Sequence, residues 1–274
     1  MPELPEVETI RRSLLPHLVG QQFRGVTVRQ ASLREPVDAA ALQRLVTGQR
    51  IIGLSRRAKY LLVHLASGHL LAFHLGMTGR LLIASSNRAI EPHDHLIFHL
   101  EHGRELRFHD VRRFGRCFVI AAAELASHPR FRRLGIDPLE PECSADYLRA
   151  RARSVRKPVK NLLMDGTVLS GVGNIYANEA LHLAAINPRT PAGRLGRARW
   201  ERLRTALRRV LEEALCQGGT TFSDFVDGEG RRGYFALALR VYGRQGQPCP
   251  RCGRPIRRFV QAGRSTFYCP SCQH

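Results

Sequence analysis

Hydrophobic and polar positions follow two different periods along this chain of 274 residues. Over residues 2–18, the apolar positions Val7, Ile10, Leu14 and Leu15 recur at helical spacing. This pattern predicts an N-terminal helix. The two prolines near its start belong to a first turn, where a missing N–H does no harm.

The pattern changes to short apolar runs between residues 23 and 120. The clearest runs are RIIGL (50–54), YLLVHL (60–65), HLLAFHL (69–75), HLIFHL (95–100) and ELRFHDV (105–111). They alternate or are dense in β-branched residues, and turn residues separate them at short intervals. Such a series predicts an antiparallel sandwich or barrel.

The second half of the chain reads as helical after a looser stretch that contains Pro129, Pro138 and Pro141. We interpret residues 131–150 as a linker. The clearest later helix covers residues 194–217, with apolar side chains on one face and arginines opposite, and two glycines then end it. A long loop rich in glycine and charge is expected to follow.

Charge is the strongest feature of the composition. Lys and Arg number 43 against 23 Asp and Glu, which gives a formal net charge of +20. A polyanionic partner would relieve the self-repulsion, so nucleic acid is the leading expectation, before an anionic membrane or a generally basic surface. No apolar run is long enough to span a membrane and no signal sequence is present, so we expect a cytoplasmic protein.

The cysteines give the most specific motif in the sequence. Cys249 and Cys252 form one CxxC pair, and Cys269 and Cys272 form a second after sixteen residues. Four thiolates at this spacing suit one structural Zn²⁺ with no open position for catalysis. A redox pair or two disulfides are the alternatives. The arginines between the pairs either contact DNA or form a solvated basic surface.

These patterns together predict an α+β chain in which a helix and a β-sandwich precede a helical part and a zinc-binding hairpin. The expected divisions are an N-terminal domain, a linker, a helical domain and a zinc finger, at residues 2–130, 131–150, 151–235 and 240–274.

A turn before a helical run offers a second site. Gly171 and Gly173 flank Val172, and such a turn presents backbone N–H groups to an anion at a helix N-terminus. Asn174 could add its amide to the same phosphate. An ordinary tight turn is the alternative.

The first residues, MPELPEVE, suggest covalent chemistry if Met1 is removed, since Pro2 then carries a secondary amine. An α-amine has a pKa of roughly 7.7–8, so a useful fraction is neutral and able to attack a sugar C1′. Glu3 could protonate the departing base or the sugar ring oxygen, and Glu6 could orient the amine or Glu3. The alternative is that acidic residues simply favour a helix N-terminus.

Motifs along the whole chain resemble bacterial formamidopyrimidine-DNA glycosylase. They run in order from MPELPEVETIRR through RRAKYLL (56–62), HLGMTG (74–79), DVRRFGR (110–116), GVGNIYANEAL (171–181) and QGGTTFSDF (217–225) to the cysteine-bearing tail. The start PELPEVE looks unlike that of the endonuclease VIII branch. The resemblance implies a monomeric enzyme with a helix–two-turn–helix motif that excises oxidised purines from double-stranded DNA and nicks the strand by β,δ-elimination.

The resemblance also implies roles for individual residues. Its nucleophile falls on Pro2, its acid on Glu3, a lysine of the lyase step on Lys59, and an arginine of the second elimination on Arg264. Without the resemblance, Lys59 is only a cation beside a strand.

Further residues are implied in DNA binding. Met77, Arg112 and Phe114 would fill the base stack, although core packing is the alternative for Met77 and Phe114. The resemblance places four more residues beside the lesion or the DNA phosphates: His74, His93, Lys160 and Asn174. Val111 stands where the family usually has proline, and the base-binding residues would fall within 222–234.

Two other functions remain open at this point. One is the same enzyme class acting on oxidised pyrimidines. The other is a zinc-dependent DNA-binding protein without catalysis.

Overall fold

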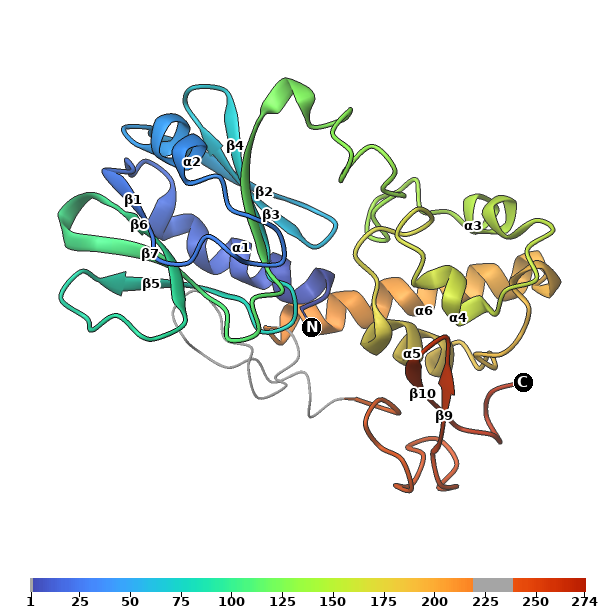
Figure 1. Cartoon of the computed structure of the whole chain (residues 1–274). Helices are drawn as coiled ribbons and strands as arrows, with labels where there is room; N and C mark the ends of the chain where they lie inside the picture. Colours follow the sequence, from blue (N-terminus) through green and yellow to red (C-terminus); the bar gives the residue numbers. More distant parts are fainter. Residues whose placement is uncertain (1, 219–238) are drawn as a thin grey trace. The chain divides into compact units, whose positions relative to one another are not determined.

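The computed structural model describes residues 2–218 and 239–274. The chain divides into two compact units (Figure 1). One contains the described residues up to Arg132 together with 217–218, and the other contains Arg133–Cys216 and residues 239–274. The expected base-binding segment 222–234 lies outside the described residues.

The first unit begins with helix α1 (Leu4–Leu18). Glu3 is its N-cap and Pro5 lies in the first turn, so Pro2 precedes the helix and does not form part of it. Val7, Ile10 and Leu14 of the predicted apolar face are buried in the core of the unit, whereas Leu15 is 38% exposed.

Two antiparallel four-stranded sheets form the rest of this unit, with strand orders β1–β6–β7–β5 and β2–β3–β4–β8. The strands are β1 (Gly25–Val28), β2 (Ile51–Arg57), β3 (Tyr60–Leu65), β4 (His69–His74), β5 (Arg80–Ser85), β6 (Asp94–His99), β7 (Arg104–His109) and β8 (Arg116–Ala121). Helix α2 (Ala39–Val46) and the 3₁₀ helices η1 (Glu101–Gly103) and η2 (Ala122–Glu124) complete its elements.

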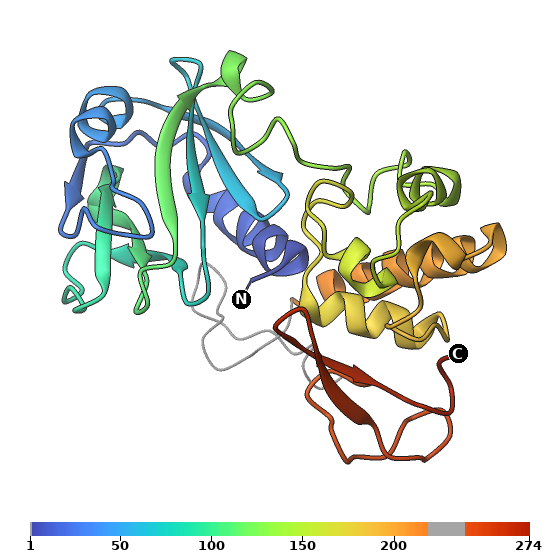
Figure 2. The ribbon, with the colours of Figure 1, turned by 45° about the vertical axis from the view of Figure 1, so that its right-hand side comes forward.

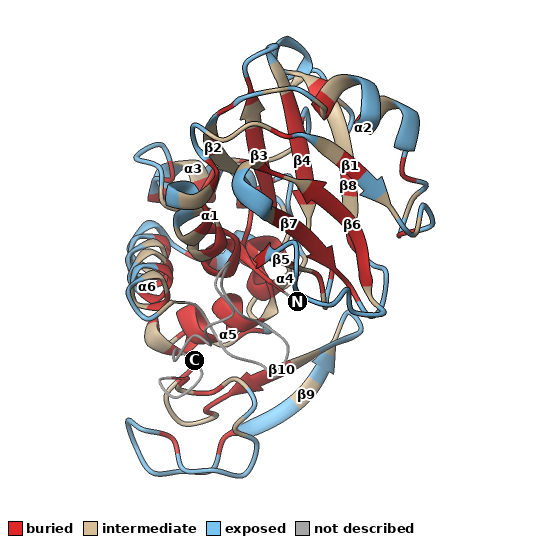
Figure 3. Cartoon of the chain, turned by 90° about the vertical axis from the view of Figure 1, so that its left-hand side faces the viewer, coloured by how far each residue is buried: buried red, intermediate tan, exposed pale blue. Residues whose placement is uncertain are grey.

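The two sheets share one core. The ring of Phe73 on β4 lies 5.5 Å from that of Phe98 on β6 and 5.9 Å from that of Phe108 on β7, so aromatic rings join the two layers. Figure 3 shows buried residues along the middle strands of this unit. The arrangement is a sandwich, one of the two architectures that the strand pattern predicted.

The second unit is built from helices. They are α3 (Ala145–Ala152), α4 (Val159–Leu163), α5 (Asn174–Leu183) and α6 (Arg197–Cys216), with the 3₁₀ helix η3 (Ala192–Arg194). Trp200 and Tyr176 are fully buried in its core. The hairpin of β9 (Arg257–Gln261) and β10 (Arg264–Tyr268) packs against α5 (Figure 2).

The α+β class with antiparallel sheets is therefore confirmed. Strand β3 has the predicted limits, whereas α2, β1, β5 and β8 were not predicted. Helix α3 begins inside the segment that was interpreted as a linker. Among the described residues, no helix combines the length and the apolar character needed to cross a membrane.

Candidate functional site

The residues before α1 are held by the helix they precede. Glu3 and Glu6 form a capping box, in which each side chain bonds the backbone N–H of the other residue. The Glu3 N–H donates to Glu6 Oε2 at 2.7 Å. Both glutamates are 2% exposed and Pro2 is buried as well. The hydrogen bond at the Glu3 N–H therefore fixes the peptide group that joins Pro2 to Glu3.

Glu8 connects α1 to the turn that carries Lys59. Its carboxylate lies 2.8 Å from Arg11 Nη2 and 3.4 Å from Arg56 Nε. Burial alone would raise the pKa of Glu8, but hydrogen bonding and charge from Arg11, with help from Arg56, outweigh it and lower the pKa. Arg56 in turn donates to the carbonyl oxygen of Ala58, which adopts a φ of 55° just before the half-buried Lys59.

Two loops are clamped together at one end of the sandwich. Asp110 is fully buried, and its carboxylate accepts hydrogen bonds from Thr78 Oγ1 at 2.6 Å and from the Gly115 N–H at 2.7 Å. Thr78 Oγ1 also accepts from the Arg112 N–H at 3.1 Å. Gly76 approaches the other loop so closely that a Cβ there would lie 2.4 Å from the Phe114 carbonyl carbon.

The clamp presents an exposed group of side chains. Met77 and Phe114 are each 39% exposed, and Val111 is 50% exposed, although such side chains are usually buried. The Arg112 guanidinium lies 4.7 Å from the centre of the Phe114 ring. The alternative of core packing for Met77 and Phe114 is therefore wrong. The valine at position 111 does not prevent an ordered loop, because Asp110 supplies the constraint.

His74 and His93, which the resemblance implies in DNA binding, both lie in the first unit. The half-buried His74 accepts a hydrogen bond at Nδ1 from the Gly76 N–H at 3.1 Å, which places its ring proton on Nε2. Burial, with the nearby charges of Arg116 and Lys59, lowers the pKa of His74 to about 3. His74 is therefore neutral near pH 7. His93 is half-buried.

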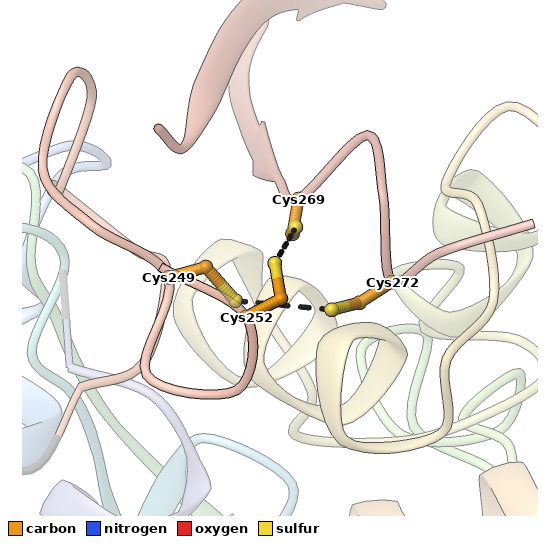
Figure 4. A group of neighbouring side chains, drawn as sticks. All are labelled: Cys249, Cys252, Cys269 and Cys272. Carbon is orange, nitrogen blue, oxygen red and sulfur yellow. Dashed lines mark hydrogen bonds between the residues drawn. The ribbon is translucent and has the colours of Figure 1, made fainter. Parts of the chain in front are cut away.

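The four tail cysteines converge as the spacing predicted (Figure 4). Their sulfur atoms all lie within 4.8 Å of one another, with Cys249 and Cys272 at 4.0 Å and Cys252 and Cys269 at 3.5 Å. Four thiolates around one tetrahedral zinc stand roughly 3.8 Å apart, given a Zn–S distance of about 2.3 Å. The cysteines are free, not disulfide-bonded, so the donor set fits a metal.

Helix α5 holds the segment that bears these cysteines. Asn174 donates to the carbonyl oxygen of Ser265 at 3.0 Å, and Asn178 accepts from the Phe267 N–H at 2.8 Å. The fully buried Glu179 accepts from three consecutive backbone N–H groups, at residues 240–242. Helix α5 therefore holds both the hairpin and residues 240–242, which precede the first cysteine pair.

The remaining predicted residues of this unit differ in exposure. Arg264 is exposed at the start of β10, directly after the hairpin tip. Lys160 is 1% exposed, and its ammonium donates to Ser265 O at 3.1 Å and to Thr266 Oγ1 at 2.7 Å. In this structure the ammonium of Lys160 holds the hairpin.

Comparison with known proteins covers the whole chain. Family models match residues 1–117 as the formamidopyrimidine-DNA glycosylase N-terminal domain, 134–226 as the H2TH domain of the same glycosylase, and 246–274 as a zinc finger found in FPG and IleRS. A formamidopyrimidine-DNA glycosylase from Halorhodospira halophila is 50% identical over 273 residues, which covers 100% of both chains. The chain belongs to the formamidopyrimidine-DNA glycosylase family.

Solved structures of the glycosylase family agree with this assignment. The MutM (Fpg) protein of Thermus thermophilus is 42% identical, with a TM-score of 0.89 over 99% of this chain and 98% of that one. The Lactococcus lactis Fpg, solved in complex with DNA containing an abasic site, is 32% identical, with a TM-score of 0.91 over 99% of both chains.

Sequence reasoning missed the buried carboxylates that hold other segments in place within each unit. Asp110, Glu8 and Glu179 are buried carboxylates whose partners include backbone N–H groups or arginines from other segments. The only signal available was a charged residue inside or beside an apolar run, which does not identify its partner.

We predict that Thr78→Val loosens the Arg112 loop, because valine keeps the shape but loses both hydrogen bonds of the hydroxyl. A net loss of about 1 kcal/mol corresponds to roughly fivefold faster amide exchange at Arg112. Hydrogen exchange measured by NMR checks this, with Thr27→Val on β1 as control. Unchanged exchange at Arg112 would contradict the clamp.

Proposed function

We propose that this chain is a bifunctional DNA glycosylase and abasic-site lyase that removes oxidised purines, such as 8-oxoguanine and formamidopyrimidines. The observation that carries the proposal is the buried, capped Pro2–Glu3 segment in a chain that matches formamidopyrimidine-DNA glycosylase over its full length. We further propose that it acts as a monomer in the cytoplasm, bound to bacterial DNA.

The first step needs a free amine on Pro2. Once Met1 has been removed, the Pro2 nitrogen forms a bond to C1′ of the damaged nucleotide while the bond from C1′ to the base breaks. Glu3 delivers a proton to the leaving base or to the sugar ring oxygen. The bond from the Glu3 N–H to Glu6 supports this proposal, because it restricts the peptide that carries both reacting groups.

The lyase step follows from the chemistry of proline. After the Pro2 nitrogen has lost its proton, the bond from C1′ to the ring oxygen breaks, the ring oxygen takes up a proton and the sugar opens to a Schiff base. Because the nitrogen is that of a proline, this Schiff base has no N–H to lose and stays a cationic iminium, which withdraws electrons from the sugar. Loss of a C2′ proton then expels the 3′ phosphate, and a second elimination expels the 5′ phosphate. We assign Lys59 to the lyase step and the exposed Arg264 to the second elimination.

The exposed loops of the sandwich suit a role in holding distorted DNA. We propose that Met77, Arg112 and Phe114 fill the space left when the damaged base leaves the stack. Base flipping costs a few kcal/mol, and the inserted side chains lower that cost. The hydrogen bonds of Asp110 and Thr78 beneath these side chains support the proposal, because side chains that enter a base stack must keep their positions against the DNA. His74 is assigned to the loop beside the lesion and His93 to a DNA phosphate.

Asn174 combines a contact to the hairpin with a proposed contact to a DNA phosphate. Its amide holds the hairpin, and its place at the first turn of α5 beside the Gly171–Gly173 turn suits a phosphate contact. Gly171 adopts a φ of 93°, a conformation that favours glycine.

We propose that Cys249, Cys252, Cys269 and Cys272 bind one structural Zn²⁺. All four positions of a tetrahedral ion would be filled by thiolates, so the ion stabilises the hairpin and takes no part in the reaction. The hairpin and its flanking segments bury few apolar residues of their own, and the metal compensates for that small core.

Glu3→Gln tests the acid. We expect base excision from an 8-oxoguanine duplex to slow by about 100-fold or more, because a positioned acid contributes 10²–10⁴-fold. Strand cleavage at a preformed abasic site should fall less, since no base has to leave. Single-turnover gel assays measure both rates, and the exposed Glu124→Gln is the matched control.

Equal rates for Glu3→Gln and the unmodified protein would contradict the role of Glu3. Faster cleavage of thymine glycol than of 8-oxoguanine would instead favour the oxidised-pyrimidine alternative. Binding of DNA by the unmodified protein without any cleavage would favour the alternative of a DNA-binding protein without catalysis.

Cys269→Ser tests the metal site. We expect the purified protein to contain one zinc per chain and the variant to lose it, because a hydroxyl replaces a thiolate ligand. Elemental analysis by mass spectrometry gives the stoichiometry. Cys216→Ser, at an exposed cysteine outside the cluster, should retain the metal. A metal-free unmodified protein, or a variant that keeps its zinc, would overturn the proposal.

A further inference from the structure

A histidine lies directly beside the cysteine cluster without belonging to it. His182 is fully buried in the last turn of α5, and its Nε2 atom lies 3.4 Å from Cys249 Sγ. The cluster already has four sulfur ligands. His182 is therefore placed to contact a metal ligand from outside the coordination sphere.

The other ring nitrogen decides which atom donates. His182 Nδ1 is buried and finds no hydrogen-bond partner within the described part of the chain. A proton on Nδ1 would leave a buried N–H unsatisfied, which is more costly than an unused lone pair. The ring is thus best satisfied when Nε2 carries the proton and donates to sulfur, as a metal-bound thiolate requires.

His182 also completes a row of contacts along α5. Asn174, Asn178 and His182 recur at a spacing of four, so they lie on one face of the helix. The first two bond the hairpin backbone at Ser265 and Phe267, and the third reaches Cys249. One helical face therefore meets both the hairpin and the metal ligands.

We propose that His182 is a positioning residue that donates an Nε2–H hydrogen bond to the zinc-bound thiolate of Cys249 and so joins the zinc site to helix α5. The proposal rests on the zinc site proposed above and not on the glycosylase reaction.

Charge explains why the bond matters. Four thiolates around a divalent ion leave a net charge of about −2, and N–H donors to sulfur disperse that charge. The Arg251 backbone N–H already lies 3.5 Å from Cys249 Sγ. His182 adds a second donor from a different element, which local CxxC geometry alone would not provide.

The test compares two variants of the full-length, zinc-loaded protein. His182→Phe keeps the ring and loses the donor, whereas His182→Gln keeps an N–H at a similar distance from the backbone. Zinc release to an excess of a chromogenic chelator is followed at neutral pH, with His69→Phe on β4 as control.

We expect release from His182→Phe to be about tenfold to hundredfold faster, the usual effect of losing a hydrogen bond to a metal ligand, and His182→Gln to remain near the unmodified rate. Unchanged release from His182→Phe would overturn the proposal. Equally fast release from both variants would also overturn it, since it would assign the effect to packing.

A measurement on the unmodified protein covers the case in which a variant does not fold. In cadmium-substituted protein with isotope-labelled histidine, we expect the His182 proton on Nε2 and a scalar coupling between that proton and cadmium. A proton on Nδ1 instead would contradict the proposal.

Discussion

The capping box at the start of α1 is the constraint on which the proposed chemistry depends. Glu3 and Glu6 bond each other's backbone N–H groups in a buried position, and the apolar face that follows fixes the helix in the sandwich core. The alternative explanation of the acidic N-terminus, that it stabilises a helix, is thus supported by the capping box and is compatible with the proposed chemistry. Capping fixes the peptide directly after Pro2, so the same contacts that start the helix restrict the proposed nucleophile.

Buried carboxylates repeat this arrangement elsewhere in the chain. Asp110 holds the Gly115 N–H and the Thr78 hydroxyl beneath an exposed group of side chains, and Glu179 holds three backbone N–H groups before the cysteine segment. An acceptor with several lone pairs can fix an irregular backbone segment that no helix or strand would hold. In each unit, an irregular backbone segment is therefore ordered by a buried carboxylate.

How much the sequence predicts depends on the range of the interaction. The limits of β3 and the convergence of the four cysteines were predictable, because apolar periodicity and CxxC spacing are local signals. The Asp110 clamp was not, since one of its partners lies 32 residues away in the chain. The burial of Lys160 was also unpredictable, because a lysine in a basic sequence gives no sign that a distant hairpin will cover it. The proposed role of Lys59 came from the family resemblance alone, which also favoured Pro2 as the nucleophile over a simple helix start.

The nucleophile is the central claim, and locating the covalent bond to DNA tests it most directly. Reduction with borohydride during reaction with an 8-oxoguanine duplex, followed by proteolysis and tandem mass spectrometry, identifies the residue that carries the sugar. We predict a chain that lacks Met1 and bears the sugar on the Pro2 nitrogen. A sugar on Lys59, or efficient cleavage by protein that still carries Met1, would contradict it.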